Sequence, residues 1–192
     1  NTDRLRLRRF DGTEADWLYE LDNDREVMRF NNGGTHTTRE FIEHSSLPLF
    51  RGTDGPVSGS GFWKILERDT YVPVGWCCLR VEEGASGTGS LGYRLVRSAW
   101  GKGYASEASH ALLRHGFEAI GLSRVKATTY EDNARSRRVL ERLGFRLVRE
   151  YREDLALQQT ASFDGSEAFP GLDLEFELRR EEWRQLSTTS GS

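Results

Sequence analysis

The sequence predicts an α/β protein built around a mixed sheet. Segments that alternate apolar and polar residues, such as 4–10, are typical of strands, whereas 104–120 carries apolar residues at helical spacing. Along the chain the expected order is one strand, two short helices, three strands, a helix, a strand, a helix and two strands. Helices interleaved with strands in this way indicate an α/β fold with a mixed sheet.

The N-terminal third is expected to contain one strand and two short helices. The strictly alternating segment 4–10 predicts the first strand, and the segments 16–22 and 38–45 predict the helices, the second with an acidic start. The glycine-rich segment 51–61, which also contains Pro56, predicts a mobile loop. This loop is the best candidate for a lid that becomes ordered when a substrate binds.

A hairpin and a further strand are expected next. The segments 62–67 and 72–82 predict the two strands of the hairpin, with a turn near Asp69. Glycine-rich residues 83–89 then lead into a fourth strand over 90–96. The sheet is therefore expected to continue through this middle part of the chain.

The second half is expected to hold the two longer helices and three more strands. The helix over 104–120 follows the stretch 98–108, and a helix over 133–143 ends at Gly144, the glycine that often follows a last helical turn. The strands are expected at 123–130, 145–151 and 172–179, with a polar connector at 153–171.

Length and composition indicate one domain over residues 1–186, followed by a disordered tail over 187–192. Apolar residues make up 36% of the chain and charged residues 30%, which is compatible with a globular core. The sequence has no run of about 18 apolar residues, and its first residues lack the apolar region of a secretory signal. A spanning helix is therefore not expected.

Charge and cysteine usage exclude further classes of protein. The formal net charge is −3, and the basic residues are spread along the chain without forming a stripe. Neither nucleic acid nor a membrane is therefore expected as a partner. Cys77 and Cys78 are adjacent and would point to opposite faces of a strand, so no disulfide is expected and a reducing cytoplasm fits best. No cysteine or histidine pattern predicts a metal site.

The stretch 98–108, SAWGKGYASEA, raises the question of phosphate binding. It is not a Walker A loop, because Val96 stands where the first glycine is needed and Lys102 is followed by glycine. It is not a Rossmann fingerprint, because Ser106 replaces the third glycine. Two interpretations are left: an ordinary turn, or a loop whose consecutive N–H groups hold a pyrophosphate at a helix N-terminus.

The residues from Leu91 to Glu150 resemble the GNAT N-acetyltransferase superfamily, especially its ribosomal-protein N-terminal acetyltransferase (Rim-type) branch. The family's coenzyme A loop, [Q/R]-x-x-G-x-[G/A], falls on residues 100–105, with Trp100 in place of Gln or Arg. The family's helix signature N-x-x-S falls on Asn133 and Ser136. Two motifs at the matching separation favour the phosphate-binding interpretation.

The resemblance implies acetyl-coenzyme A as donor and a primary amine as acceptor. It also implies a mostly antiparallel sheet of about seven strands, flanked by helices and splayed between the fourth and fifth strands, with the pantetheine arm in the gap. Backbone groups at the end of the fourth strand would pair with that arm, and the loop amides would take the pyrophosphate. The residues expected to bind coenzyme A are Leu95, Val96, Trp100, Gly101, Lys102, Gly103, Tyr104, Ala105, Ser106, Asn133 and Arg137.

Transfer to an amine needs a base for the ammonium proton and an acid for the departing thiolate. In the Rim-type branch the serine of the N-x-x-S position protonates the sulfur, so the resemblance implies this role for Ser136, whose other interpretation is an ordinary residue in the first turn of a helix. The tyrosine that many other relatives use is replaced here by Leu140. Relatives often carry a glutamate base where this chain has Ser90. The base is therefore left open between Tyr93, water and the third strand's last residues, Glu82 and Glu83.

Several other residues have both a functional and a structural interpretation. Phe30, Trp63 and Trp76 suggest an aromatic acceptor pocket, although core packing explains such residues more often than not. Arg137 and Arg138 either reach the 3′-phosphate of coenzyme A or face water.

The sequence as a whole predicts an acetyl-coenzyme A-dependent N-acetyltransferase. Its acceptor is expected to be a protein N-terminus or a small amine, and the negative net charge favours a cationic one. The alternative is a GNAT-like module that binds acyl-coenzyme A without turnover, as a sensor or partner-binding domain. A monomer and a homodimer are both compatible with the sequence.

Overall fold

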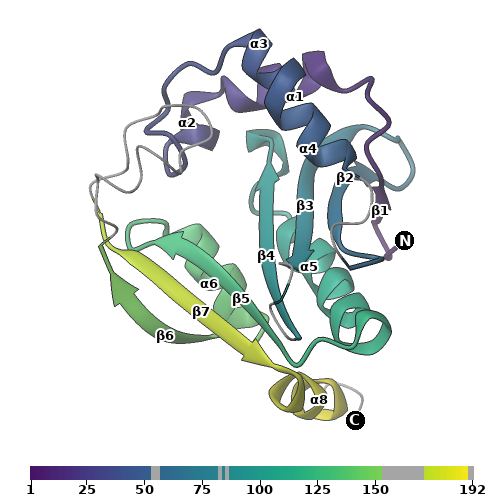
Figure 1. The fold of residues 1–192 in the computed structure, drawn as a ribbon, viewed down its shortest axis with the longest axis vertical. Coiled ribbons are helices and arrows are strands. Elements are labelled where there is room, and N and C mark those ends of the chain that lie inside the picture. Colours follow the sequence, from purple (N-terminus) through teal and green to yellow (C-terminus); the bar gives the residue numbers. More distant parts are fainter. Residues whose placement is uncertain (53–56, 82–83, 85–86, 153–170, 190–192) are drawn as a thin grey trace.

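Seven strands form one sheet in the computed structural model, which describes residues 1–52, 57–81, 84, 87–152 and 171–189. The strands are β1 (Leu5–Arg8), β2 (Gly61–Glu67), β3 (Pro73–Val81), β4 (Thr88–Leu95), β5 (Arg124–Tyr130), β6 (Arg146–Tyr151) and β7 (Asp173–Arg179). Their order across the sheet is β1-β2-β3-β4-β5-β7-β6 (Figure 1). Every neighbouring pair is antiparallel except β4 and β5, which are parallel. The predicted α/β fold with a mixed, mostly antiparallel sheet is confirmed.

The sheet divides between β4 and β5. These strands pair only where Thr88–Ser90 lie beside Arg124–Lys126, whereas β4 pairs with β3 from Gly89 to Leu95 and β5 pairs with β7 along its whole length. Beyond Ser90 the two strands diverge, as Figure 1 shows. The predicted splay between the fourth and fifth strands is confirmed.

Helices cover both faces of the N-terminal half of the sheet and pack against the C-terminal strands. They are α1 (Ala15–Asp22), α2 (Arg25–Met28), α3 (Arg39–Phe41), α4 (Leu47–Arg51), α5 (Tyr104–Arg114), α6 (Ala134–Arg142) and α8 (Arg180–Thr189). A π-helical segment, Ile42–Ser46, joins α3 to α4, and a second one, His115–Ile120, continues α5. In Figure 1 the helices α1 to α4 lie beyond the carboxyl end of β4 and over the neighbouring strands.

Two apolar clusters lie on opposite faces of the sheet. Cys77 belongs to the larger cluster, beneath α5, and Cys78 to the smaller one, beneath α1 to α4. Phe62 belongs to the smaller cluster as well, where its ring stacks on that of Phe50 at 4.4 Å. Both cysteines are free and buried, as expected of neighbours on one strand.

The structure differs from the sequence prediction in its shorter helices. The helix expected at 38–45 continues to Arg51, and two helices were not predicted: α2, capped by the Asp24 carboxylate, and α8, anchored by buried Trp183. The latter reaches Thr189, into the stretch predicted as a disordered tail. Among the described residues no helix is both long and apolar enough to cross a membrane.

Candidate active site

A cleft with a volume of about 920 Å³ opens where β4 and β5 part. Most of its lining comes from five groups of residues: the segment 26–31 in and after α2, the last residues of β4, the loop leading into α5, the end of β5, and the start and inward face of α6; Asp173 at the start of β7 also lines it. The cleft therefore gathers the coenzyme A loop and the N-x-x-S helix, which were predicted separately from the sequence.

The loop before α5 depends on two glycines in left-handed conformations. Gly101 has a φ of 75° and Gly103, which precedes the first residue of α5, a φ of 80°. A side chain at either position would be strained, because left-handed backbone favours glycine. A Cβ at Gly101 would meet nothing within 4 Å, whereas one at Gly103 would lie 3.4 Å from Nη2 of Arg4. The predicted strand–loop–helix arrangement is present.

Backbone N–H groups at the start of α5 suit an anion. The first helical hydrogen bond runs from the amide of Glu107 to the carbonyl of Gly103, so the preceding amides have no partner within the helix. Gly103, Ala105 and Ser106 line the cleft. The helix dipole adds partial positive charge at the same point. These residues fit the pyrophosphate that the resemblance implies.

Lys102 turns away from the cleft. Its ammonium lies 3.8 Å from Oε1 of Glu67 and 5.8 Å from the centre of the Tyr104 ring, and it is not among the lining residues. The hydroxyl of Tyr104 donates to the same carboxylate at 3.0 Å. The contribution of this loop to a ligand is therefore mainly backbone.

The face of α6 that lines the cleft carries three arginines, of which only Arg138 was singled out from the sequence. Arg135, Arg138 and Arg142 line the cleft, whereas Arg137 donates to the carbonyl of Glu131 at 3.1 Å. The spacing of three and four residues puts the first three on one helix face. That helical phase is the signal by which they are recognised.

Trp100 links this helix to the loop. The guanidinium of Arg135 lies 4.4 Å from the centre of the Trp100 ring, and the indole N–H donates to the carbonyl of Leu95 at 3.0 Å. Five arginines and three acidic residues line the cleft, so its charge is opposite in sign to that of the whole chain. The described residues therefore fit the phosphates of coenzyme A.

The two residues expected to take part in catalysis are in contact. The Tyr93 hydroxyl lies 2.9 Å from the hydroxyl of Ser136, and either oxygen can donate. Tyr93 comes from β4, and Ser136 lies in the first turn of α6, where its amide donates to the carboxamide of Asn133 at 3.2 Å. Asn133 is therefore the N-cap of α6, and this bond holds Ser136 at the cleft.

Burial raises the pKa of Tyr93 to about 12, although the hydrogen bond with Ser136 opposes this shift. A phenol with such a pKa is protonated at neutral pH, so Tyr93 is suited to donate a proton or hydrogen bond. It is not suited to serve as the general base, which was one of its expected roles.

The backbone at the end of β4 is already partly engaged. The amide of Val96 donates to the carbonyl of Val74 at 3.0 Å, so it is not available to a pantetheine arm or a developing oxyanion. The carbonyl of Leu95 accepts from Trp100 but keeps a second lone pair. Of these two residues, only Leu95 lines the cleft.

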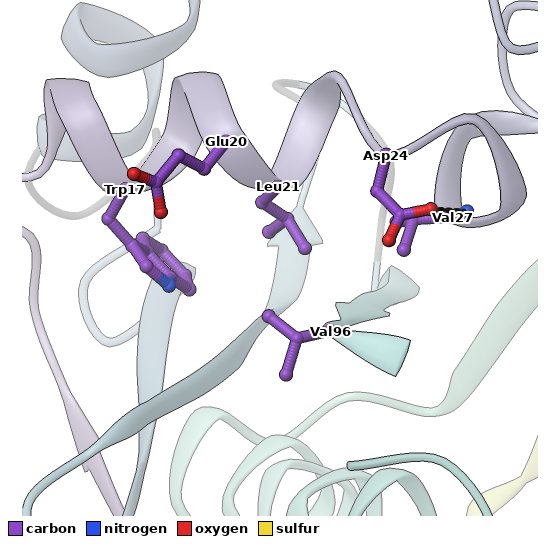
Figure 2. Close-up of a pocket in the computed structure, with 6 residues that line it drawn as sticks. All are labelled: Trp17, Glu20, Leu21, Asp24, Val27 and Val96. Atoms are coloured by element: carbon purple, nitrogen blue, oxygen red, sulfur yellow. Dashed lines mark hydrogen bonds between the residues drawn. The ribbon is translucent and has the colours of Figure 1, made fainter. Parts of the chain in front are cut away.

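The side chain of Val96 instead lines a small neighbouring pocket of about 100 Å³. In Figure 2 Val96 extends from the end of β4 toward Leu21 of α1, with Trp17 beside them. Val27 lines both this pocket and the main cleft, so the two hollows adjoin. Val96 was expected to bind the cofactor, but its side chain faces α1 and the small pocket instead of the main cleft.

The structure brings only one of the three predicted acceptor aromatics to the cleft. Phe30 lines it, beside α2. Trp63 packs against the larger core, on the opposite face of β2 from Phe62. The guanidinium of Arg9 lies 3.9 Å from the centre of the Trp63 ring. Trp76 is buried in the smaller core, and Arg94, which does line the cleft, lies over it at 5.1 Å.

The predicted lid and base are placed only in part. Residues 53–56 of the proposed lid, Glu82 and Glu83 lie outside the described residues. At the end of the lid segment, the carbonyl of Gly59 lies 2.8 Å from Nε2 of His115, and Ser60 is buried. The C-terminal end of this segment is therefore fixed by the protein itself, with no acetyl acceptor bound. Ser90 lies where β4 and β5 still pair.

The carboxylates at the cleft were missed by sequence reasoning. The three that line it are Glu26, Asp132 and Asp173. Asp173 is 8% exposed and lies opposite Tyr130 in the sheet register, where β7 begins. No local motif marks these residues, because chain segments far apart bring them together.

Comparisons with known proteins agree along most of the chain. A family model described as the acetyltransferase (GNAT) domain matches residues 4–146. The uncharacterized N-acetyltransferase p20 of Bacillus licheniformis is 31% identical over 157 residues, covering 78% of this chain and 85% of p20. A GCN5-related N-acetyltransferase from Brucella melitensis matches in fold with a TM-score of 0.76 at 18% identity, covering 98% of this chain and 81% of that one. Spermidine N-acetyltransferase from Vibrio cholerae, crystallised with CoA and spermine, has a TM-score of 0.72 at 13% identity, covering 94% and 98%.

Proposed function

The chain belongs to the GNAT acetyltransferase family and is an N-acetyltransferase, and from this premise we propose that it moves the acetyl group of acetyl-coenzyme A to a primary amine. The observation that carries the proposal is the Tyr93–Ser136 hydrogen bond in the same cleft as the glycine-containing loop. We further propose one catalytic domain that extends to the end of α8 at Thr189.

Different parts of the cleft bind different parts of the donor. The amides around Gly103 and the inward arginines of α6 bind the phosphates, and the diverging edge of β4 receives the pantetheine arm. When bound, acetyl-coenzyme A supplies a thioester carbonyl that a neutral amine can attack.

Ser136 holds the proton that the leaving sulfur needs. In the overall step a carbon–nitrogen bond forms, the carbon–sulfur bond breaks, and the sulfur takes the proton of the Ser136 hydroxyl. Tyr93 is protonated at neutral pH and sits within hydrogen-bond distance, so it can pass its own proton to the serine oxygen. The ammonium nitrogen loses two protons. One goes to water or to a carboxylate lining the cleft before the amine attacks. The second leaves as the amide forms and returns through water to the Tyr93 oxygen, so that both hydroxyls are protonated again and the step balances.

For the acceptor we propose a protein N-terminus. The resemblance of residues 91–150 to the Rim-type branch supports this choice. The α2 side of the cleft offers Phe30, Arg29 and Glu26 as its walls, which is compatible with a peptide that carries both polar and apolar groups. A small-molecule amine is the alternative, since spermine accompanies the Vibrio cholerae structure.

An acceptor panel tests the proposal. Release of free thiol from acetyl-coenzyme A is followed with peptides bearing free N-termini, with spermine and with simple amino acids. We expect a peptide to be the best acceptor. Preference for spermine would reassign the acceptor, whereas tight coenzyme A binding without turnover on any amine would support the non-catalytic alternative.

A further inference from the structure

Arg4, directly before β1, reaches from the N-terminus to the loop that precedes α5. Its Nη1 donates to the carbonyl of Lys102 at 2.9 Å, and its Nε donates to Oε2 of Glu107 at 2.7 Å. The backbone amide of Arg4 and the hydroxyl of Thr2 both donate to the other oxygen of Glu107, at 2.9 and 2.6 Å. About 100 residues apart in sequence, these groups form one cluster behind the loop.

The bond to Lys102 decides where the next amide points. The carbonyl of Lys102 and the N–H of Gly103 belong to one planar trans peptide unit, so they point in opposite directions. Arg4 holds the carbonyl on the outer side. Gly103 lines the cleft, whereas Lys102 and Arg4 do not. This arrangement fits an N–H of Gly103 that is directed to the cleft side.

Arg4 also offsets a carboxylate in the first turn of α5. Its Nη2 lies 2.6 Å from Oε2 of Glu107, whose side chain is 16% exposed. Partial burial acts to raise the pKa of Glu107, but hydrogen bonds from Thr2 and Arg4 outweigh it and hold that pKa below its ordinary value. An unpaired carboxylate here would repel a pyrophosphate at the same helix end.

We infer that Arg4 is a positioning residue for the acetyl donor. It fixes the loop so that its amides face the cleft, and it neutralises Glu107 beside the place where the diphosphate binds. Arg4 acts through the loop and does not itself contact the donor. The inference rests on the proposed function, in which that donor is acetyl-coenzyme A.

The test compares two donors in the full-length enzyme. Acetyl-coenzyme A carries the diphosphate, whereas acetyl-pantetheine has the same thioester arm without it. For Arg4→Met we expect the KM for acetyl-coenzyme A to rise at least tenfold with kcat unchanged, and both constants for acetyl-pantetheine to stay the same. Calorimetry with coenzyme A gives the same comparison without an acceptor.

A matched control lies two residues further along the chain, in β1. Arg6 donates to the carbonyl of Arg68 at 3.0 Å and packs over Tyr71 at 4.5 Å, so its guanidinium is engaged by other residues than the loop. Arg6→Met should leave both donors unaffected. Arg4→Lys should recover part of the loss, because lysine keeps the charge and can bond one of the two oxygen partners.

Each outcome bears on the inference. An equal loss of activity with both donors overturns the inference, because Arg4 would then contribute only to general stability. No loss of activity for Arg4→Met overturns it as well. If Arg4→Met does not fold, Arg4→Lys decides by the same comparison of donors. A wild-type enzyme that uses acetyl-pantetheine as well as acetyl-coenzyme A overturns the proposed diphosphate site, and this inference with it.

Discussion

The hydroxyl of Tyr93 on β4 lies 2.9 Å from the hydroxyl of Ser136 on α6, and this contact crosses the splay of the sheet. The residues are 43 positions apart and come from the two sides of the cleft. Because the tyrosine is protonated at neutral pH, the pair forms a short chain of proton donors where the two halves of the sheet separate.

Tyr93→Phe should lower kcat and also change the dependence of stability on pH. The folded-state pKa of about 12 is above the ordinary value of 10, because burial disfavours the phenolate. The stability linked to this group is therefore complete below pH 10 and is lost as the pH rises from 10 toward 12. Urea unfolding between pH 9 and 11.5 checks this. The wild type should lose more stability over that range than Tyr93→Phe, and identical profiles would contradict the assigned shift.

Gly101→Ala should weaken coenzyme A binding beyond its effect on stability. The new Cβ meets no atom within 4 Å, so the folding cost is that of left-handed backbone, about 1–2 kcal/mol. Gly33 provides the control, because it also has a positive φ, 64°, and an open Cβ direction. Both variants should lose similar stability in urea, and only Gly101→Ala should bind coenzyme A more weakly. Equal calorimetric affinities for the two would contradict the loop assignment.

Arg138→Met should reduce the affinity for coenzyme A about tenfold, by removing one charge-assisted contact to phosphate. Arg137→Met, on the adjacent helix position, should have a much smaller effect on affinity, because its guanidinium bonds the carbonyl of Glu131. Calorimetry at two salt concentrations measures both. A larger loss for Arg137→Met would mean that the helix face has been misassigned.

The buried ion pair of Asp22 and Arg94 should matter to folding. The two atoms Oδ1 and Nη1 lie 2.5 Å apart, and the side chains are only 6% and 14% exposed. Asp22→Asn leaves the guanidinium of Arg94 without its counterion, so the free energy of unfolding should fall by about 3–5 kcal/mol. Asp16→Asn breaks an exposed pair with Arg39 and should change it little. Denaturant unfolding of both variants tests the contrast.

The sequence predicted those features that depend on local chemistry. Glycines at 101 and 103 indicated a special backbone, which their positive φ values confirm, and Asn133 indicated the helix start that it caps. The Tyr93–Ser136 contact was not predictable in this way, because it depends on how far β4 and β5 diverge. The family resemblance suggested Ser136, and Tyr93 was one of several candidates for the base, but their hydrogen bond was not expected.

The aromatic residues show a second limit. Phe62 and Trp63 are neighbours on β2, yet they pack into different cores on opposite faces of the sheet. Composition alone does not tell which face an aromatic side chain will take. The arginines of α6 are likewise of one residue type, and only their positions around the helix distinguish them. Arg138 lies at the cleft, whereas Arg137 lies away from it and bonds the carbonyl of Glu131.

The most direct measurement of the account is turnover of the wild type and Ser136→Ala with two thioesters that differ in the acidity of the leaving thiol. The substitution keeps the backbone bond to Asn133, and alanine favours helix, so coenzyme A affinity and stability should be nearly unchanged. With acetyl-coenzyme A, kcat should fall by about 10²–10⁴, and the more acidic thiol should recover part of that loss because it needs less protonation. An equal loss with both thioesters, or no loss with either, would contradict a role for Ser136 in protonating the sulfur.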